Sequence, residues 1–325
     1  MPIIASKKFR SPYRQINGHF QTIIPSFFRE VSGVAYSRKR LNTPDNDFID
    51  LDISKQNTGR DKAVLISHGL EGNTGRHYVK GVVKIFNQNR WDVFAWNYRS
   101  CSGEMNLLPR FYHHADTPDL AFVIEEVFKL NPQIASLVLV GFSLGGNLTC
   151  RYLGENPQGD NRIKAGVAVS VPCDLQRCAY ELEKPTKHFY NKRFFSKLKE
   201  KVEAKSKTMP EHISMEAMEK YKIKSCRLFD EHYTAPLHGF KSAEDFYIKA
   251  GCKVKLPFIA TPTLLLNAEN DPFLAGLCYP KEIARKNKML FLEIPKNGGH
   301  TGFEIKGQEF TYAEERALEF ANKYV

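Results

Sequence analysis

Short apolar runs recur along the chain and are separated by helix-like or loop segments. Continuous runs of this kind are typical of strands that are buried on both faces, as in a parallel sheet covered by helices. Their alternation with helix-like segments therefore predicts an α/β fold with a mostly parallel central sheet and flanking helices. The runs are Ala63–Ser67, Trp91–Asn97, Leu137–Val140, Ala165–Ser170, Thr263–Asn267 and Met289–Ile294.

Three of the intervening segments have clear helical features. Thr117-Pro118-Asp119 has the form of an N-cap followed by proline in the first turn, and it predicts a helix over 120–130. A second helix is expected over 147–153, and a closing helix is expected over 312–324. These helices would cover the sheet.

One long segment lacks any buried-strand pattern. Residues 174–255 are rich in Lys and Glu, with aromatic residues such as Phe189 and Tyr190 among them. A passive connection of this length would be unusual in a globular domain. We therefore predict a helical cap at 174–255, inserted into a core that consists of 61–173 and 256–325.

The beginning of the chain also departs from the alternating pattern. Residues 1–60 are expected to form an N-terminal strap and a hairpin of the core. Turn-forming residues at Thr43-Pro-Asp-Asn-Asp47 favour the hairpin.

A nucleophile elbow is the most informative motif in the sequence. Gly141-Phe142-Ser143-Leu144-Gly145 follows the run at 137–140 and precedes the helical pattern at 147–153. This strand–turn–helix setting is the one in which G-x-S-x-G presents a reactive serine. Side chains at 141 and 145 would clash with the backbone of so tight a turn. The motif predicts Ser143 as the nucleophile.

A serine hydroxyl needs a base and the base needs a carboxylate. His300 lies in a glycine-rich loop after the last predicted strand, and Asp271 follows the strand at 263–267. The resulting order Ser143, Asp271, His300 is that of α/β-hydrolases.

Other side chains compete for these two roles. His68, at the end of the first core strand, and His113 and His114, which precede a helix, are less well placed as the base. Asp174 is the alternative acid, and Glu269 is a neighbour that tunes or solvates the site.

An oxyanion hole is expected near the serine. One donor is the backbone N–H of Leu144, directly after the nucleophile. The second is expected from His68-Gly-Leu-Glu-Gly72, where the N–H of Leu70 follows a glycine that lets the backbone approach the substrate.

Several classes of protein are disfavoured by the residues that are missing. The chain has no P-loop, no dinucleotide-binding G-x-G-x-x-G after a first strand and no H-E-x-x-H pattern, so neither a cofactor nor a metal is expected. Its seven cysteines are irregularly spaced, which favours reduced thiols. No signal-peptide or membrane-span pattern is recognisable, and a cytoplasmic enzyme is expected.

The net charge of +11 raises the question of an acidic partner. A nucleic-acid protein should combine basic residues with a stacking or groove-reading motif, and none is found. About half of the excess falls in 174–255. A solvated helical face explains it, and a weak peripheral contact of the cap with anionic membrane is the sharper hypothesis.

The motifs jointly resemble those of the YheT-type α/β-hydrolases, which include bacterial esterases and eukaryotic ABHD lipid enzymes. The resemblance implies an α/β-hydrolase fold and catalysis by Ser143, Asp271 and His300. It depends on His19-Phe-Gln-Thr22, Thr43–Asp52, His68–Gly72, Asn97–Gly103, Tyr112-His113, Gly141–Asn147, Tyr233–Phe240, Asn270–Phe273 and Gly298–Phe303.

The chain departs from the family pattern at three places. Ser100 replaces a usual glycine, Asn270 replaces a usual aspartate, and His114-Ala115 replace a small residue and glycine. His19-Phe-Gln-Thr22 and Tyr233-Thr-Ala-Pro236 have no derivable catalytic role and are interpreted as packing of the strap and the cap.

The function expected from these features is cleavage of a carboxylic ester through an acyl-enzyme. The substrate is expected to be a small-molecule or lipid ester, and the enzyme could also be a lipase or phospholipase. Acyl transfer to an alcohol uses the same triad and stays open. A non-catalytic binding module is the least favoured alternative because the three catalytic residue types are all present.

Overall fold

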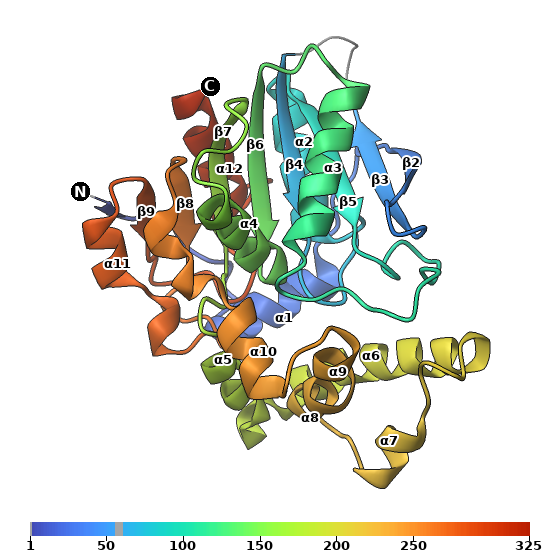
Figure 1. Ribbon diagram of the computed structural model, residues 1–325. Coiled ribbons are helices and arrows are strands. Elements are labelled where there is room, and N and C mark those ends of the chain that lie inside the picture. The colour runs from blue at the N-terminus through green and yellow to red at the C-terminus, as the bar shows by residue number, and fades with distance from the viewer. Residues whose placement is uncertain (1, 56–60) are drawn as a thin grey trace.

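The computed structural model describes residues 2–55 and 61–325 (Figure 1). Strands in these residues form one sheet in the order β1-β9-β8-β7-β6-β4-β5-β3-β2. Neighbouring strands are parallel except at β2–β3 and β3–β5, which confirms the predicted α/β fold with a mostly parallel sheet. The strands are β1 (Ile3–Ile4), β2 (Ser37–Asn42), β3 (Phe48–Ser54), β4 (Lys62–Ser67), β5 (Asp92–Asn97), β6 (Ser136–Phe142), β7 (Ile163–Val169), β8 (Thr263–Leu266) and β9 (Leu290–Glu293).

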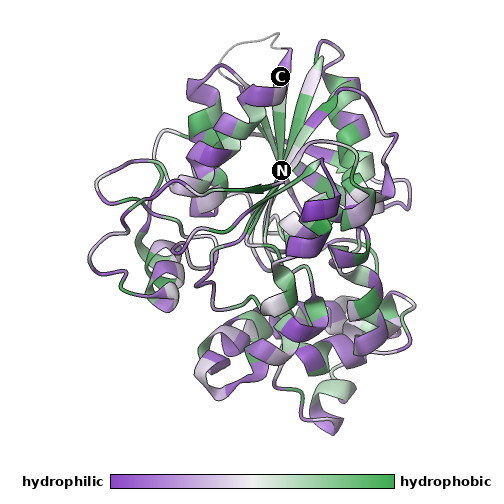
Figure 2. Cartoon of the chain, turned by 90° about the vertical axis from the view of Figure 1, so that its left-hand side faces the viewer, coloured by the Kyte–Doolittle hydropathy of each residue, from purple (hydrophilic) through white to green (hydrophobic). Residues whose placement is uncertain are grey.

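Helices cover both faces of the sheet, and their apolar side chains form two separate cores. Within β4, Leu65 faces one core and Val64 the other, and both side chains are buried. This explains why the strands read as continuous apolar runs, and Figure 2 shows the hydrophobic strands between helices of mixed character. On one face lie α3 (Thr117–Leu130), α4 (Leu144–Glu155) and α11 (Lys281–Lys286); on the other lie α2 (His77–Gln88) and α12 (Tyr312–Tyr324).

Between β7 and β8 every regular element that the structure describes is a helix, and the long segment is expected to be a cap. In Figure 1 the arrowheads of the parallel strands point toward these helices, so they lie at the carboxyl edge of the sheet. The exact bounds 174–255 stay a prediction. The elements are α5 (Leu175–Glu183), η1 (Pro185–Lys187), α6 (His188–Thr208), α7 (Glu216–Lys220), α8 (Cys226–Phe229), η2 (Asp230–Thr234), α9 (Ala235–Leu237) and α10 (Ala243–Ala250), after which η3 (Cys252–Val254) and η4 (Leu256–Phe258) lead into β8.

The predicted N-cap of α3 was one residue too late. The helix already includes Thr117, and Asp116 occupies the cap position. The Thr117 hydroxyl donates to Glu155 on α4 at 2.8 Å instead of capping its own helix. A tertiary hydrogen bond has replaced the local one that the sequence pattern suggests.

The N-terminal segment contains the expected hairpin and an unexpected helix. β2 and β3 pair antiparallel around the turn at 43–47, as predicted. A helix, α1 (Gly18–Phe28), lies where only a strap was expected, between the sheet and the cap helices (Figure 1). Residues 1 and 56–60 of the expected 1–60 segment lie outside the described residues.

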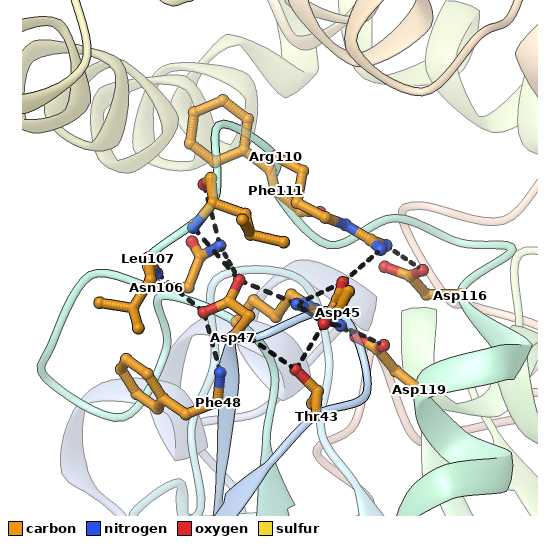
Figure 3. Close-up of polar contacts among 12 residues, drawn as sticks. Thr43, Asp45, Asp47, Phe48, Asn106, Leu107, Arg110, Phe111, Asp116 and Asp119 are labelled. Atoms are coloured by element: carbon orange, nitrogen blue, oxygen red, sulfur yellow. Dashed lines mark hydrogen bonds and ion pairs between the residues drawn. The ribbon is translucent and has the colours of Figure 1, made fainter.

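A buried ion cluster fixes the loop after β5, which supports the cap. The Arg99 guanidinium bonds both carboxylate oxygens of Asp119 at 2.7 Å and Asp47 at 2.8 Å. Figure 3 shows Asp47 and Asp45 of the hairpin turn beside Asp119 of α3. Lys205 of α6 then donates to the backbone oxygen of Asn106 in this loop at 3.2 Å.

Ser100 has an unusual backbone conformation within the same loop. Its φ of 62° lies in the left-handed region, which explains why glycine suits this position in the family. The Ser100 hydroxyl compensates by bonding the Asn106 side chain at 2.5 Å.

Candidate active site

The elbow places Ser143 at the carboxyl end of β6, immediately before α4. Its φ of 54° and ψ of −115° are strained for a residue with a side chain. A Cβ on Gly141 would lie 2.1 Å from the backbone oxygen of Gly145, and one on Gly145 would lie 2.2 Å from that of Ser67. Only glycine fits at 141 and 145, for the steric reason that the sequence suggests.

His300 lies between Ser143 and Asp271 and bonds both. Its Nε2 is 2.9 Å from the Ser143 Oγ, and its Nδ1 is 2.9 Å from the Asp271 Oδ2. The other carboxylate oxygen of Asp271 accepts a hydrogen bond from the backbone N–H of Phe273 at 2.9 Å. The structure therefore brings the three predicted residues into one hydrogen-bonded chain. A base in this position can take the serine proton while the carboxylate holds the imidazole tautomer.

The alternative acids have other partners. Asp174 caps α5 by accepting from the N–H of Arg177, and it also pairs with Lys253 at 3.5 Å. Glu269 is exposed to solvent. Neither carboxylate bonds His300 in the described residues.

The alternative bases also lie elsewhere. Burial lowers the pKa of His68 to about 3 and the pKa of His114 to about 3, so both rings are neutral near pH 7. The ring of His113 accepts a hydrogen bond from the N–H of Ala115 at 3.1 Å.

His68 instead fixes the loop that carries the expected oxyanion donor. Its Nε2 accepts from the N–H of Tyr98 at 3.3 Å, which leaves Nδ1 to donate to the Gly69 oxygen at 2.8 Å. A Cβ on Gly69 would lie 3.2 Å from that of Ser143, so this loop passes directly beside the nucleophile. Within 2–55 and 61–325, the N–H groups of Leu70 and Leu144 bond no other residue. Their role as oxyanion donors stays a prediction.

The helix α1 supplies contacts to the histidine loop that the sequence interpretation missed. The backbone N–H of His300 donates to the Thr22 hydroxyl at 2.8 Å, and that hydroxyl donates to the Gly18 oxygen at 2.6 Å. Gln21 accepts from the N–H of Gly298 at 2.7 Å. The motif at 19–22 therefore does more than pack a strap: it holds the loop that carries His300.

Asn270 extends this network to the loop that carries Asp271. Its amide donates to the Gln21 side chain at 2.9 Å and accepts from the N–H of Gly299 at 3.1 Å. An amide both donates and accepts, whereas an ionised aspartate could only accept. The two hydrogen bonds give the departure from the family pattern at 270 a structural reason.

A cleft leads from the protein surface to Ser143 and runs between α1 and α6. Thr22, Ile23 and Ser26 of α1 line one wall, and Phe189 and Arg193 of α6 line the other. At its base the ring of Phe273 packs on that of His300, with 4.1 Å between the centroids. A mostly apolar cleft with a few polar groups is typical of a small-molecule site.

A second, buried cavity lies behind Leu70 and Leu144, under the cap. Apolar side chains, among them Leu198 and Phe229, line most of it. Its wall also includes the ion pair between Lys201 and Glu71, whose Nζ and Oε1 are 2.8 Å apart. Leu70 borders both spaces, so the cavity adjoins the cleft at this expected oxyanion donor.

The described residues contain neither a cluster of metal-ligating side chains nor a helix that could span a membrane. No three His, Cys, Asp or Glu side chains in 2–55 and 61–325 are grouped as a metal site would require. None of the helices in these residues combines the length and the apolar character needed to cross a bilayer.

Comparison with known proteins identifies relatives over most of the chain. YheT of Escherichia coli (strain K12) is 31% identical over 88% of this chain and 84% of its own. Phospholipase ABHD3 of Mus musculus is 28% identical over 94% of this chain and 76% of its own. Monoacylglycerol lipase of Saccharomyces cerevisiae is also 28% identical, over 90% of this chain and 64% of its own.

The fold comparison agrees with the sequence comparison. The solved structure of the esterase Pf2001 from Pyrococcus furiosus superimposes with a TM-score of 0.57 and 18% identity, covering 90% of this chain and 93% of that one. A family model described as the alpha/beta hydrolase fold matches residues 62–306. On these matches the chain belongs to the α/β-hydrolase family, in the branch that includes YheT.

Proposed function

We propose that the protein is a serine hydrolase that cleaves carboxylic esters through an acyl-enzyme intermediate. The observation that carries this proposal is the hydrogen-bonded chain from Ser143 through His300 to Asp271. The strained conformation of Ser143 at the elbow supports it, because it presents the hydroxyl at the base of the cleft.

In the first half of the reaction, the Ser143 Oγ attacks the ester carbonyl while His300 takes its proton at Nε2. The N–H groups of Leu70 and Leu144 bind the oxyanion that forms. As the tetrahedral intermediate collapses, the bond to the alcohol oxygen breaks and His300 returns the proton to that oxygen. The alcohol leaves, and the acyl group stays on Ser143.

In the second half, water replaces the alcohol. His300 removes a proton from the water as it attacks the acyl carbonyl, and it gives that proton to the Ser143 Oγ as the bond to this oxygen breaks. Asp271 stabilises the imidazolium in both halves without being protonated itself. An alcohol in place of water would give acyl transfer, so adding ethanol or glycerol and measuring the product ratio separates the two reactions.

The substrate class is proposed to be a lipid ester. Relatives named phospholipase and monoacylglycerol lipase support this class, as do the phenylalanine side chains that line the cleft. A hydrolysis profile over acyl esters of increasing length, with a monoacylglycerol and a phospholipid, tests it. Preference for acetyl esters over all longer chains would contradict it.

A cytoplasmic location is proposed as well. All seven cysteines are free thiols, including Cys178 and Cys278, whose sulfur atoms are 3.3 Å apart in a hydrogen bond and not in a disulfide. Free thiols are typical of reducing compartments. Fractionation of the native cells with an antibody against the chain checks this.

The catalytic proposal is tested with a fluorophosphonate, which labels an activated serine covalently. Wild-type protein should be labelled at Ser143, and Ser143→Ala should lose labelling and about 10⁶ of the ester hydrolysis rate. Ser37→Ala, at an exposed serine on β2, is the matched control and should behave as wild type. Unchanged hydrolysis in Ser143→Ala would contradict the proposal.

A further inference from the structure

The helix α1, which forms one wall of the cleft, has its polar and apolar faces inverted. Its buried face includes Gln21 and Thr22, which bond the His300 loop. Its outward face exposes Phe20 by 42%, Phe27 by 54% and Phe28 by 76%. A surface helix of a globular protein normally directs its apolar residues inward and its polar residues toward water. Large side chains such as these indicate a surface that meets something other than water.

The segment that precedes α1 also exposes large side chains. Tyr13 is 81% exposed and Ile16 is 77% exposed. The first 29 residues contain no Asp or Glu, and the 11 residues of α1 contain no charged residue at all. The outward face of α1 is therefore apolar, and the helix has no acidic side chain.

The opposite wall of the cleft is aromatic and cationic. Residues 184–199 hold six Lys and Arg residues and no Asp or Glu. Phe189, Lys192 and Arg193 share one face of α6, since they are three and four positions apart. Phe189 is half exposed.

Direct contacts join the two walls at the mouth. The Arg193 guanidinium lies 4.4 Å from the ring centroid of Phe27, and the ring of His19 bonds the hydroxyl of Tyr190 at 3.0 Å. Lys187 is close enough to lower the pKa of His19, after the larger effect of burial. The mouth surface defined by these two walls consists of Phe20, Phe27, Phe28, Phe189, Lys187, Lys192 and Arg193.

We propose that this mouth surface docks on an anionic lipid–water interface, so that a lipid ester enters the cleft directly from the lipid. The purpose of this docking rests on the proposed ester hydrolysis, although docking itself is a separate property of the protein. Phenylalanine side chains insert at the boundary between headgroups and acyl chains, and Lys and Arg beside them attract anionic headgroups. The mouth surface combines both around the entrance to Ser143.

Charge favours a membrane over a second copy of the chain. Two copies that met through this surface would bring cationic walls together with no acidic side chain from either 2–29 or 184–199 to pair them. An anionic bilayer supplies the missing negative charge. Ionic strength should then weaken docking, since screening acts on exposed charges.

Flotation with vesicles tests the proposal on the full chain. Wild type should bind vesicles of phosphatidylcholine and phosphatidylserine at 7:3, bind pure phosphatidylcholine far less, and lose binding as salt is raised. The double variant Phe27→Ser/Phe28→Ser and the single variant Lys192→Glu should each bind at least about tenfold less. These three residues neither line the cleft nor contact the triad, so hydrolysis of a short soluble ester should stay within about twofold of wild type, which also checks folding.

Matched controls test whether the loss of vesicle binding is specific to the mouth surface. Phe258→Ser removes an equally exposed phenylalanine on η4, and Lys286→Glu reverses a charge at the end of α11. Both should bind like wild type. Equal losses in the controls, or no wild-type binding to the anionic vesicles, would overturn the proposal. So would a wild type that forms a dimer and binds no vesicles, if the dimer dissociates in Phe27→Ser/Phe28→Ser.

Ser143→Ala separates docking from catalysis. The variant should bind vesicles as wild type does while it hydrolyses nothing. Vesicle binding by a wild type that cleaves no ester would contradict the proposed function and leave docking standing. Ester cleavage by a wild type that binds no vesicles would contradict docking and leave the proposed function standing.

Discussion

Thr22 shows how one hydroxyl can support a catalytic loop from a distant part of the chain. It accepts the backbone N–H of His300, and its partner loop contains two glycines with positive φ, Gly298 and Gly299. A loop with so much backbone freedom needs fixed points to hold an imidazole in place. The Thr22 hydroxyl is one of them.

Thr22→Val should therefore reduce catalysis without unfolding the protein. The substitution keeps the shape of the side chain but leaves a buried N–H unpaired, which costs about 1–3 kcal/mol. If that cost displaces His300, kcat should fall by about 10–100-fold, while KM changes little. Steady-state kinetics with a soluble ester and the rate of fluorophosphonate labelling of Ser143 measure this.

Thr22→Ser is the matched control, because it retains the hydroxyl. It should restore kcat to within a few-fold of wild type. A Thr22→Val enzyme with wild-type kcat would contradict the role of Thr22 in positioning His300.

His68 should make stability depend on pH. Burial lowers the pKa of its ring to about 3, whereas an unfolded histidine has a pKa near 6.5. Between these values the unfolded chain binds a proton that the folded chain excludes. The stabilisation is complete above pH 6.5 and is lost as the pH falls toward 3, by at most about 1.4 kcal/mol per pH unit.

Calorimetric unfolding at pH 5, in buffers of different ionisation heat, measures the proton uptake. His68→Gln should be less stable overall, and its uptake should be smaller by about one proton. Equal uptake in wild type and His68→Gln would contradict the neutral state of this ring.

At the scale of secondary-structure elements, the Arg99 cluster joins the hairpin turn, the loop after β5 and α3. The Arg99 side chain is 2% exposed, and Asp47 beside it is fully buried. Arg99→Gln would leave two carboxylates, Asp47 and Asp119, buried without their cation. Breaking one side of a buried pair costs about 3–5 kcal/mol, and urea unfolding should show a loss of this size.

The matched control for this prediction is an ion pair in solvent. Arg285 pairs with Glu282 on α11, and both side chains are more than half exposed. Arg285→Gln should change the free energy of unfolding by less than about 1 kcal/mol. Similar losses of unfolding free energy in the two variants would show that burial does not determine the cost of breaking an ion pair.

The elements differ in how well the sequence predicts them, for physical reasons. The strands β4–β9 could be located because burial on both faces requires a continuous apolar run. The helix α1 could not, because its polar side chains face inward and its phenylalanines face outward, which removes the usual amphipathic pattern. Proline at 25 within the helix also argues against it locally.

The residues of the candidate site also differ in how well the sequence predicts them. The local motifs were enough to single out Ser143, Asp271 and His300, since each stands in a loop directly after a predicted strand. The contact between Thr22 and His300 spans 278 positions, so only the fold reveals it. The sequence offered one sign of this contact, the motif at 19–22, for which no catalytic role could be derived.

On the scale of the whole molecule, the cap has a hydrophobic cluster of its own that is separate from the two cores of the sheet. Phe111, from the loop after β5, is a buried member of it beside Val202 of α6 and Phe229 of α8. A separate cluster can open without the sheet. Hydrogen exchange should therefore show weaker protection in α6 and α8 than in β4, β6 and β7.

Phe111→Ala should widen this difference in hydrogen-exchange protection between the cap helices and the sheet strands. Removal of a buried ring costs about 3–5 kcal/mol, and here the loss of protection should be confined to the cap. Phe128→Ala, on α3 in one of the two cores of the sheet, is the comparison and should lower the protection of the sheet strands as well. Equal effects of the two substitutions across the molecule would show that cap and sheet unfold together.

The distance along the chain between Ser143 and His300 has a consequence for biosynthesis. The two residues are 157 positions apart, although their side chains touch. At about 5–20 residues per second, a ribosome needs roughly 8–30 s to add the histidine after the serine. Throughout that interval the nascent polypeptide carries the serine without the histidine that is proposed to deprotonate it. The emerging chain therefore cannot assemble this hydrogen-bonded pair until most of the protein has been made.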